Sequence, residues 1–215
     1  MKRKTIFTSL KMNGHTDIPR WKRTLDIIVI LLILPLVLPL AALIAVLIRL
    51  VSDGPVLFRQ ERVGHQGRRF MCLKFRTMFV GADARQPELE ARNEANGALF
   101  KIRDDPRLTW VGRRLRRYSL DELPQLVNVL RGQMSLVGPR PLPQRDYDRL
   151  EAWHMKRYLV LPGMTGLWQV SGRAELSFDD LVRLDFLYLE RWSVFLDLTI
   201  LAKTLPAVIW GRGAF

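Results

Sequence analysis

An unbroken run of 22 apolar residues, Ile27 to Ile48, constrains this chain more than any other feature of its sequence. At about 1.5 Å per residue, the run would form a straight helix of roughly 33 Å, which matches a hydrocarbon core of about 30 Å. Between Arg23 and Arg49 the only charged residue is Asp26. The segment is therefore expected to enter a membrane.

Two features distinguish this segment from a simple membrane span. Pro35 and Pro39 lie near its centre, where each removes a helix hydrogen bond and favours a kink. Both flanks are basic, so the positive-inside rule permits both ends on the cytoplasmic side. A re-entrant helical hairpin and a kinked single-span anchor fit these observations about equally. A cleaved signal peptide fits less well, because the run is long and no A-x-A-like site follows it.

The remaining sequence is long enough for one domain with its own core. We divide the chain into a mobile basic tail at 1–20, a membrane helix at 21–50 and a folded domain at 51–215. The net charge of +13 favours anionic partners, which include nucleic acid, phospholipid headgroups and phosphate-bearing substrates. The single Cys72 excludes an internal disulfide, so a cytosolic face is the more natural location.

Local patterns predict an α+β fold that is rich in helices. Short apolar pieces between residues 54 and 78, with Gly64 and Gly67 between them, predict a β-hairpin. Phe195 to Trp210 is apolar but too interrupted to span a membrane, and it is expected to be an interfacial or a buried helix. Further helices are expected at 81–97, 107–117, 120–131, 144–158 and 177–190.

The strongest candidate for chemistry is the pair Asp121-Glu122, which follows four arginines within residues 113–117. At a helix N-terminus, the dipole and the arginines would keep both carboxylates ionised, able to attack phosphorus or to bind Mg²⁺. The arginines themselves suit a diphosphate. Ser119 with Glu122 is also an ordinary capping box, and the spacing alone favours that structural interpretation. Pro124 weakens it slightly, because a proline inside the helix removes one backbone bond.

Other motifs carry basic or glycine-rich positions. Gly138-Pro139-Arg140-Pro141 would hold an arginine on a rigid turn, and strand alternation puts Lys74 and Arg76 on one face. A solvated loop and solvated strand charges explain the same patterns. The three histidines form no spaced metal set, and the sequence contains neither a GxxxxGK[ST] loop nor a GxGxxG fingerprint.

Taken in order, these motifs resemble the bacterial sugar transferases, the monotopic polyprenyl-phosphate phosphoglycosyl transferases. The resemblance covers about residues 20 to 215, and the C-terminus is most similar to short exopolysaccharide-initiating members of the succinoglycan type. The motifs that carry it are Lys22-Arg23-x-x-Asp26, Phe58-x-Gln60-x-Arg62-Val63-Gly64, Lys74-Phe75-Arg76-Thr77-Met78, Asp105-Pro106-Arg107, Ser119-Leu120-Asp121-Glu122-Leu123-Pro124-Gln125-Leu126, Gly138-Pro139-Arg140-Pro141 and Pro162-Gly163-Met164-Thr165-Gly166-Leu167-Trp168-Gln169.

The resemblance implies a re-entrant membrane helix that breaks at Pro39 and Pro35, with interfacial amphipathic helices. It places the catalytic domain, residues 51–215, on the cytoplasmic face of the bacterial inner membrane. Family members commonly have Ser-Pro at the helix break, whereas this chain has Leu38-Pro39 and an additional proline. The extra N-terminal transmembrane bundle of larger relatives is not seen in this sequence.

The resemblance also implies a reaction, the transfer of a sugar 1-phosphate from a UDP-sugar to undecaprenyl phosphate with release of UMP. Asp121 would be the nucleophile, and Glu122 with Asp121 would hold Mg²⁺. The expected phosphate-binding residues are Arg116 and Arg140, supported by Lys74, Arg117 and Asp185.

The basic surface would dock on membrane phospholipid, and the apolar C-terminus permits a homodimer. Two other functions are weighed against this enzyme. A non-catalytic membrane scaffold or regulator of polysaccharide synthesis would explain the basic tail and the interfacial segments. Nucleic-acid binding rests on net charge alone, and no recognisable module supports it, so no nucleic-acid partner is expected.

Overall fold

The strand pair predicted between residues 54 and 78 forms the main part of the larger sheet. β1, Leu57–Val63, pairs antiparallel with β2, Arg69–Phe75. The connecting turn contains Gly67 at φ 74°, a left-handed conformation that glycine adopts readily. β4, Leu142–Pro143, pairs with the end of β1 and gives the strand order β2-β1-β4. The predicted hairpin is therefore confirmed.

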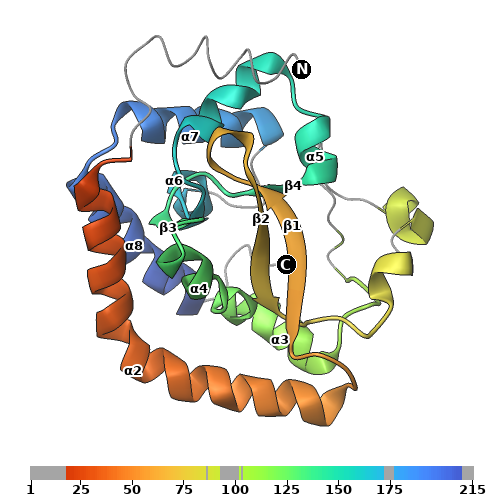
Figure 1. The fold of residues 1–215 in the computed structure, drawn as a ribbon. Helices are drawn as coiled ribbons and strands as arrows, with labels where there is room; N and C mark the ends of the chain where they lie inside the picture. Colours follow the sequence, from red (N-terminus) through yellow and green to blue (C-terminus); the bar gives the residue numbers. More distant parts are fainter. Residues whose placement is uncertain (1–17, 86, 93–101, 103, 172–176, 210–215) are drawn as a thin grey trace.

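The computed structural model describes residues 18–85, 87–92, 102, 104–171 and 177–209. Most of the described elements are helices, which confirms the helix-rich α+β fold (Figure 1). A second, parallel sheet joins β3, Ser135–Val137, to β5, Gly163–Thr165. The α-helices are α2 (Arg20–Val51), α3 (Trp110–Arg117), α4 (Gln125–Leu130), α5 (Gln144–Asp148), α6 (Leu167–Val170), α7 (Phe178–Glu190) and α8 (Val194–Ile209). The 3₁₀ helices are η1 (His65–Gly67), η2 (Ala82–Arg85), η3 (Pro87–Arg92), η4 (Leu120–Glu122) and η5 (Ala152–Leu159).

Three of the predicted helices differ from the observed ones. The described part of 81–97 forms the short helices η2 and η3, and the end of that range lies outside the described residues. The range 120–131 divides into η4 and α4, because Pro124 stands between them without an N–H to donate. The range 144–158 divides into α5 and η5. The helices predicted at 107–117 and 177–190 are confirmed as α3 and α7.

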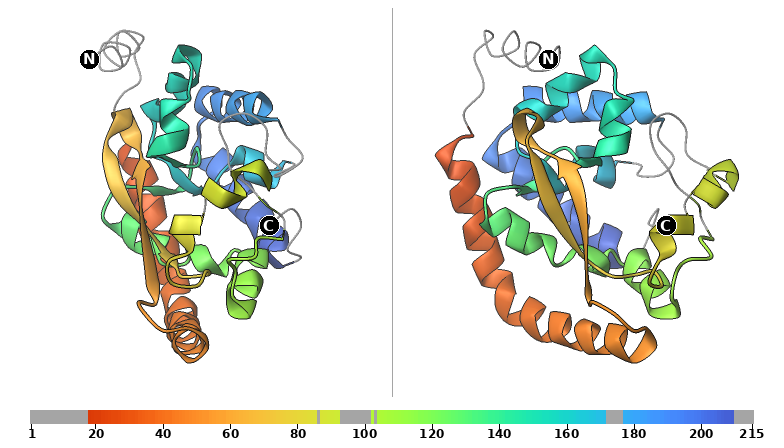
Figure 2. Two further views of the ribbon diagram at one scale, coloured as in Figure 1. Left: turned by 90° about the vertical axis from the view of Figure 1, so that its right-hand side faces the viewer. Right: turned by 45° about the vertical axis from the view of Figure 1, so that its right-hand side comes forward.

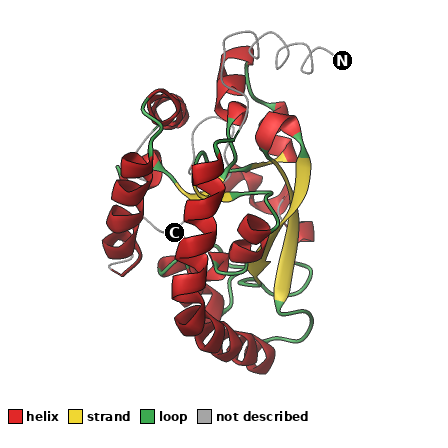
Figure 3. Cartoon of the chain, turned by 60° about the vertical axis from the view of Figure 1, so that its left-hand side comes forward, coloured by secondary structure: helices red, strands yellow, loops and turns green. Residues whose placement is uncertain are grey.

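Helix α2 contains the predicted membrane helix and bends near its middle. Its first half runs along one side of the molecule and its second half along the adjacent side, as Figures 1 and 3 show from different directions. Pro35 and Pro39 lie inside it, where each interrupts the helix hydrogen bonds. By length and composition the helix could cross a membrane. The large apolar side chains on its outer face are exposed, among them Leu31, Leu32, Leu36, Leu38, Leu43, Val46 and Leu50.

Polar contacts attach the first half of α2 to the domain. Lys22 forms a buried ion pair with Asp197 of α8. One carboxylate oxygen of Asp26 accepts hydrogen bonds from the Ser135 hydroxyl at 2.9 Å and the Leu136 N–H at 3.0 Å. Arg23 donates to the carbonyl groups at the C-terminal end of α4. Since these partners come from α8, β3 and α4, this half of α2 belongs to the same folded unit as the sheets.

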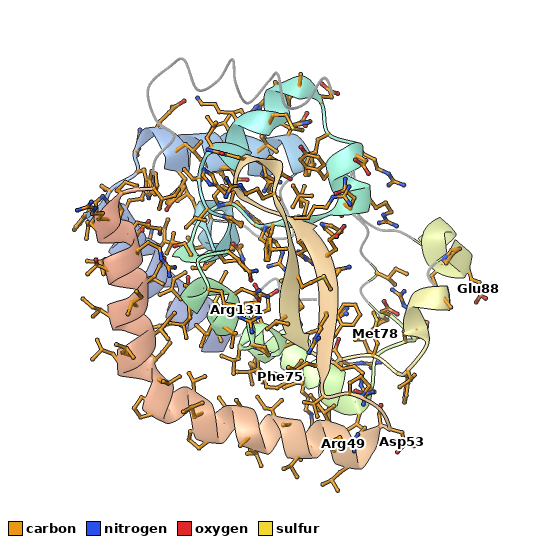
Figure 4. The ribbon with its side chains drawn as sticks, viewed as in Figure 1. Arg49, Asp53, Phe75, Met78, Glu88 and Arg131 are labelled. Carbon is orange, nitrogen blue, oxygen red and sulfur yellow. The ribbon has the colours of Figure 1, made fainter. Side chains whose placement is uncertain are left out.

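The second half of α2 is attached by its own contacts. Ile44 and Ile48 pack with Phe75 and with the buried face of α3. After the helix ends, Arg76 donates to the Ser52 and Asp53 carbonyls at 2.7 and 2.6 Å. Figure 4 shows Asp53 beside Arg49 at this end of the helix. The chain is therefore held to the domain on both sides of the bend. Figure 2 shows the bent α2 along the domain from two further directions.

A buried cluster behind the hairpin joins α2 to the strands. Ile30 of α2 packs with Phe70 and Cys72 of β2, and with side chains from α4, β3, α7 and α8. Cys72 is only 1% exposed, and its thiol is free. The first half of α2 thus shares one buried core with β2, to which α4, β3, α7 and α8 also contribute.

Candidate active site

Asp121 and Glu122 lie in the short 3₁₀ helix η4, which the chain enters through a left-handed residue. Ser119 has φ 53°, and the turn carries the backbone from the end of α3 into η4. Within the described residues, the Ser119 side chain makes no capping hydrogen bond. The prediction of a capping box, which the spacing favoured, is therefore wrong. The side chain of Glu122 is left available to the cations that surround it.

Two cations hold Glu122. Lys74 Nζ lies 2.7 Å from Glu122 Oε1, and Arg140 donates through both Nη atoms to the same carboxylate, at 2.6 and 3.3 Å. Lys74 Nζ is also 3.5 Å from Asp121 Oδ2. Lys74 comes from β2, Arg140 from the turn before β4, and the carboxylates from η4. The structure thus brings together four of the residues predicted from sequence.

The two carboxyl groups differ in their electrostatic surroundings. Burial raises the pKa of Asp121, and the positive charge of Lys74 only partly opposes this effect. Burial also acts to raise the pKa of Glu122, but Arg140 and Lys74 outweigh it and hold that pKa far below the usual value. We expected both carboxylates to stay ionised beside a helix dipole. For Asp121 the surroundings act in the opposite direction, since η4 is too short to provide a dipole and Glu122 adds a like charge.

Arg116 lies near the carboxylates and is held by Thr77. Its Nε donates to Thr77 Oγ1 at 3.1 Å, and its charge helps to lower the pKa of Asp121 against the effect of burial. The position of α3 depends on Gly112, because a Cβ there would lie 1.9 Å from the Thr77 carbonyl oxygen. The close packing of α3 on Thr77 thereby sets the position of Arg116.

Two of the predicted phosphate-binding residues lie elsewhere. Arg117 is exposed, and its guanidinium carbon lies 5.8 Å from the centre of the Tyr118 ring. Asp185 is buried in α7 and bonded to Arg157, with its Oδ2 atom 2.9 Å from Arg157 Nε. Arg76, which alternation placed beside Lys74, instead holds the end of α2, because β2 ends at Phe75.

Sequence reasoning missed two arginines that support the turn before β4. Arg62 Nη1 donates to the Pro141 carbonyl at 2.5 Å, and Arg157 Nη2 donates to the Arg140 carbonyl at 3.1 Å. Arg62 belongs to one of the motifs named above, which could have marked it. Arg157 stands in a mixed stretch of charged and aromatic residues, and nothing in that pattern separates it from solvated neighbours.

The site can be tested for its fit to Mg²⁺. Among the described residues, no group of three or more His, Cys, Asp and Glu side chains is placed to hold a metal ion. Mg²⁺ commonly binds through one or two carboxylates together with substrate phosphates. The adjacent carboxylates of Asp121 and Glu122 meet that smaller requirement. Burial raises the pKa of Asp121 more than the nearby cations lower it, so a bound cation would stabilise its ionised form.

Comparisons with known proteins identify relatives of this chain. The profile of the family described as "Bacterial sugar transferase" matches residues 18–211. The exopolysaccharide production protein ExoY of Rhizobium meliloti is 42% identical over 201 residues, which cover 90% of this chain and 88% of ExoY. The undecaprenyl-phosphate galactose phosphotransferase of Salmonella typhimurium is 43% identical over 199 residues, covering 90% of this chain and 41% of that protein.

A third relative, the galactosyl transferase CpsE of Streptococcus agalactiae, is 44% identical over 164 residues. These residues cover 76% of this chain and 36% of CpsE, so the chain spans little more than a third of that protein. The match with ExoY, in contrast, extends over most of both chains. Since the profile covers nearly the whole sequence, and relatives above 40% identity accompany it, the chain belongs to the bacterial sugar transferase family.

Proposed function

We propose that this protein transfers a sugar 1-phosphate from a UDP-sugar to undecaprenyl phosphate and releases UMP. The observation that carries the proposal is the buried Asp121-Glu122 pair, whose Glu122 forms ion pairs with Lys74 and Arg140, in a chain of this family. A relative is named undecaprenyl-phosphate galactose phosphotransferase, which supports the general reaction. The product, a polyprenyl-diphosphate sugar, would begin the membrane stage of exopolysaccharide or related glycan assembly.

The proposed chemistry has two displacement steps at phosphorus. In the first, a carboxylate oxygen of Asp121 attacks the phosphorus that bears the sugar, and the bond from that phosphorus to the bridging oxygen breaks. UMP leaves with the electron pair, and a phosphosugar-aspartyl intermediate remains. In the second, an oxygen of undecaprenyl phosphate attacks the same phosphorus, and the Asp121 carboxylate is released. Two steps suit substrates that arrive from water and from lipid.

The cations of the site would bind the diphosphate. Arg140 presents a planar fork of donors, and such forks pair with phosphate oxygens as they pair with the Glu122 carboxylate. Lys74 contacts both carboxyl groups, so its ammonium group can move from them toward the phosphates when the substrate binds. Arg116 adds positive charge on the side of Thr77. Together these residues would keep Asp121 and an anionic substrate within reach of each other.

Mg²⁺ is proposed as the cofactor, held by Glu122 and Asp121. When bound, the ion supplies positive charge that offsets the diphosphate and stabilises the leaving phosphate. Glu122 suits this role because the surrounding cations keep it ionised. Asp121 suits nucleophilic attack because it has the weaker charge compensation of the two carboxylates.

The bent α2 is proposed to enter and leave the membrane on the same side. Its halves are attached to one domain by Lys22 and Asp26 before the bend and by Ile44 and Ile48 after it. A straight span would carry one set of these contacts away from the domain. Its outer face is apolar and exposed, so it is suited to hydrocarbon rather than water. The domain would then lie on the cytoplasmic face of the inner membrane.

Helix α3 supports the proposed docking on phospholipid. Trp110, Arg113, Arg114 and Arg117 line a shallow depression on its outer face, and Trp110 is 58% exposed. The Arg114 guanidinium carbon lies 5.5 Å from the centre of a Trp110 ring. An exposed tryptophan beside arginines suits the headgroup region of an anionic leaflet. Helix α8 exposes Phe195 and Leu198 and is proposed as a second interfacial helix.

The reaction is tested with the full chain in detergent or nanodiscs. Undecaprenyl phosphate and Mg²⁺ are supplied with UDP-galactose, UDP-glucose or the UDP-N-acetylhexosamines in turn, and UMP release is measured. We expect release with at least one donor, and loss of release without Mg²⁺ or in Asp121→Asn. If the protein binds anionic vesicles but releases UMP from none of these donors, the scaffold function replaces the enzyme. Normal turnover by Asp121→Asn would exclude Asp121 as the nucleophile.

The membrane topology is tested separately with tags at the two ends of the chain. In spheroplasts, where only the periplasmic side is open to protease, both tags should resist digestion. Both should be cleaved after the membrane is permeabilised. Digestion of one tag in intact spheroplasts would establish a single-span anchor instead.

A further inference from the structure

The turn that carries Arg140 is held at three successive carbonyl groups. The Pro139 carbonyl accepts from the Gly163 N–H of β5 at 2.9 Å. The next two accept from the side chains of Arg157 and Arg62, at 3.1 and 2.5 Å. The three donors belong to β5, η5 and β1, so the backbone of the turn is fixed from three directions. Arg157 holds the carbonyl group of Arg140 itself.

Arg157 is in turn fixed by Asp185. The guanidinium is 1% exposed, and its Nε and Nη2 atoms lie 2.9 and 2.7 Å from Asp185 Oδ2. The same Nη2 atom donates to the Arg140 carbonyl. A lysine has a single nitrogen and cannot reproduce this fork, which reaches a carboxylate on α7 and a backbone oxygen on the turn together.

The ion pair is not needed to join η5 to α7. Met155 and Tyr158 already pack with Phe178, Leu181 and Val182 in one buried cluster. A buried ion pair generally adds little net stability, because removing both charges from water costs about as much as their attraction returns. The contribution that packing cannot make is the hydrogen bond to the Arg140 carbonyl.

We propose that Arg157 and Asp185 form a positioning pair that aims the Arg140 guanidinium at the diphosphate of the nucleotide sugar. The inference rests on the proposed role of Arg140 in phosphate binding. Asp185 acts three contacts away from Glu122, through Arg157 and then Arg140. This differs from the supporting role in phosphate binding that the family resemblance implied for Asp185. Neither residue of the pair touches the substrate.

The test uses the full chain and UDP, the part shared by every UDP-sugar, with Mg²⁺ present. Arg157→Met combined with Asp185→Asn removes both buried charges and leaves similar side-chain volumes. Calorimetry should show the Kd for UDP raised about tenfold, the effect of losing one hydrogen bond that orders a charged group. Arg157→Lys keeps the charge and the ion pair, and it should weaken UDP binding as well. The melting temperature of each variant shows whether it is folded.

A matched control lies beside the pair. Lys156 and Glu190 also join η5 to α7, at 3.1 Å, but both are exposed. Glu190→Gln should leave UDP binding unchanged.

A double-mutant cycle with Arg140→Ala separates positioning from general structural support. In that background, the Arg157→Met and Asp185→Asn substitutions should have no further effect on the Kd for UDP. If the effects of the pair and of Arg140→Ala simply add, or if folded pair variants bind UDP normally, the positioning role is wrong while the role of Arg140 stands. If Arg140→Ala itself binds UDP normally, the proposed function of Arg140 fails together with the inference.

Discussion

Asp121 and Glu122 are neighbours in the sequence, but they contribute to stability in opposite ways. The folded protein raises the pKa of Asp121 mainly through burial, so its ionised form costs stability at neutral pH. Although burial opposes it, Arg140 and Lys74 lower the pKa of Glu122. The ionised form of Glu122 therefore stabilises the fold above its unfolded pKa, and this contribution is lost as the pH falls. Substitutions of the two residues should therefore both reduce activity but change the stability of the fold in opposite directions.

Asp121→Asn should reduce UMP release by at least about a thousandfold, because the proposed nucleophile is lost. Its melting temperature should equal or exceed that of the wild type, because no buried charge remains at that position. Glu122→Gln should also lose activity, but its melting temperature should fall, since Arg140 and Lys74 lose their anionic partner. The melting temperatures of both variants are measured by thermal unfolding in detergent without Mg²⁺.

The exposed Glu61, paired with Arg69 on the hairpin, provides a control for these two variants. Glu61→Gln should change neither activity nor melting temperature. A clear fall in the melting temperature of Asp121→Asn would contradict the assigned difference between the two carboxyl groups.

Asp185 predicts a pH dependence of stability that differs from that of an ordinary ion pair. Burial raises its pKa to about 6, although Arg157 acts to lower it. The folded state therefore keeps a proton that the unfolded state loses near pH 4, and stability falls with pH between about 4 and 6. The full change is on the order of 3 kcal/mol. The free energy of unfolding, measured with denaturant, should therefore fall for the wild type relative to Asp185→Asn as the pH rises across that window. If the wild type instead gains stability relative to Asp185→Asn as the pH rises, the charge of Arg157 outweighs the effect of burial on the pKa of Asp185.

At the scale of elements, the Lys22 and Asp197 pair joins the first half of α2 to α8. Both side chains are buried, so removing one partner leaves an unpaired charge inside the protein. Lys22→Met or Asp197→Ala alone should therefore cost about 3–5 kcal/mol of unfolding free energy. Lys22→Met combined with Asp197→Leu should recover most of that loss. Tryptophan fluorescence can follow the unfolding, because the ring of Trp21, the residue before Lys22, lies 5.8 Å from the ring of Trp192.

The exposed pair of Arg183 and Asp180 on α7 gives the corresponding control. Arg183→Ala should cost less than about 1 kcal/mol. A double variant of Lys22 and Asp197 as unstable as the single variants would show that hydrogen bonding in this cluster, rather than charge, holds the two helices together.

The elements that sequence patterns predicted well have strong local signals. The hairpin has apolar strands around Gly64 and Gly67, and α2 has its apolar run. The predicted helix at 120–131 fails because two local features compete with helix propensity. Ser119 adopts a left-handed conformation, and Pro124 cannot donate a backbone hydrogen bond. The first of these has no signature in the residue types.

The same contrast applies to the site. Lys74, Glu122 and Arg140 are far apart in the sequence, yet the motifs named them, and the fold brings them into contact. Arg157 could not be found in this way, because its role depends on burial and on a backbone carbonyl. Arg117 shares the motif of Arg116 but lies on the other face of α3, since adjacent helical residues point in different directions.

For the whole molecule, the bend in α2 is the feature that fits the helix to its domain. As a straight helix, its 32 residues would extend for roughly 48 Å, and the contacts of its two halves could not both form. Pro35→Ala combined with Pro39→Ala favours the straight helix, so we expect lower thermal stability and lower UMP release in nanodiscs. Pro206→Ala in α8, which removes a helical proline away from the bend, should have little effect. Unchanged stability and turnover in the double variant would mean that the contacts alone impose the bend.

Cys72 is a natural reporter of the buried core that α2 shares with β2, α4, β3, α7 and α8. Its free thiol is buried in that core together with Ile30 of α2, so a labelling reagent reaches it only when the core opens or the protein unfolds. The rate of thiol labelling in intact nanodiscs therefore measures how often this core opens. Lys22→Met should accelerate labelling, whereas Glu61→Gln, on the same hairpin but exposed, should not. Because Cys72 is the only cysteine in the chain, this measurement needs no engineered label site.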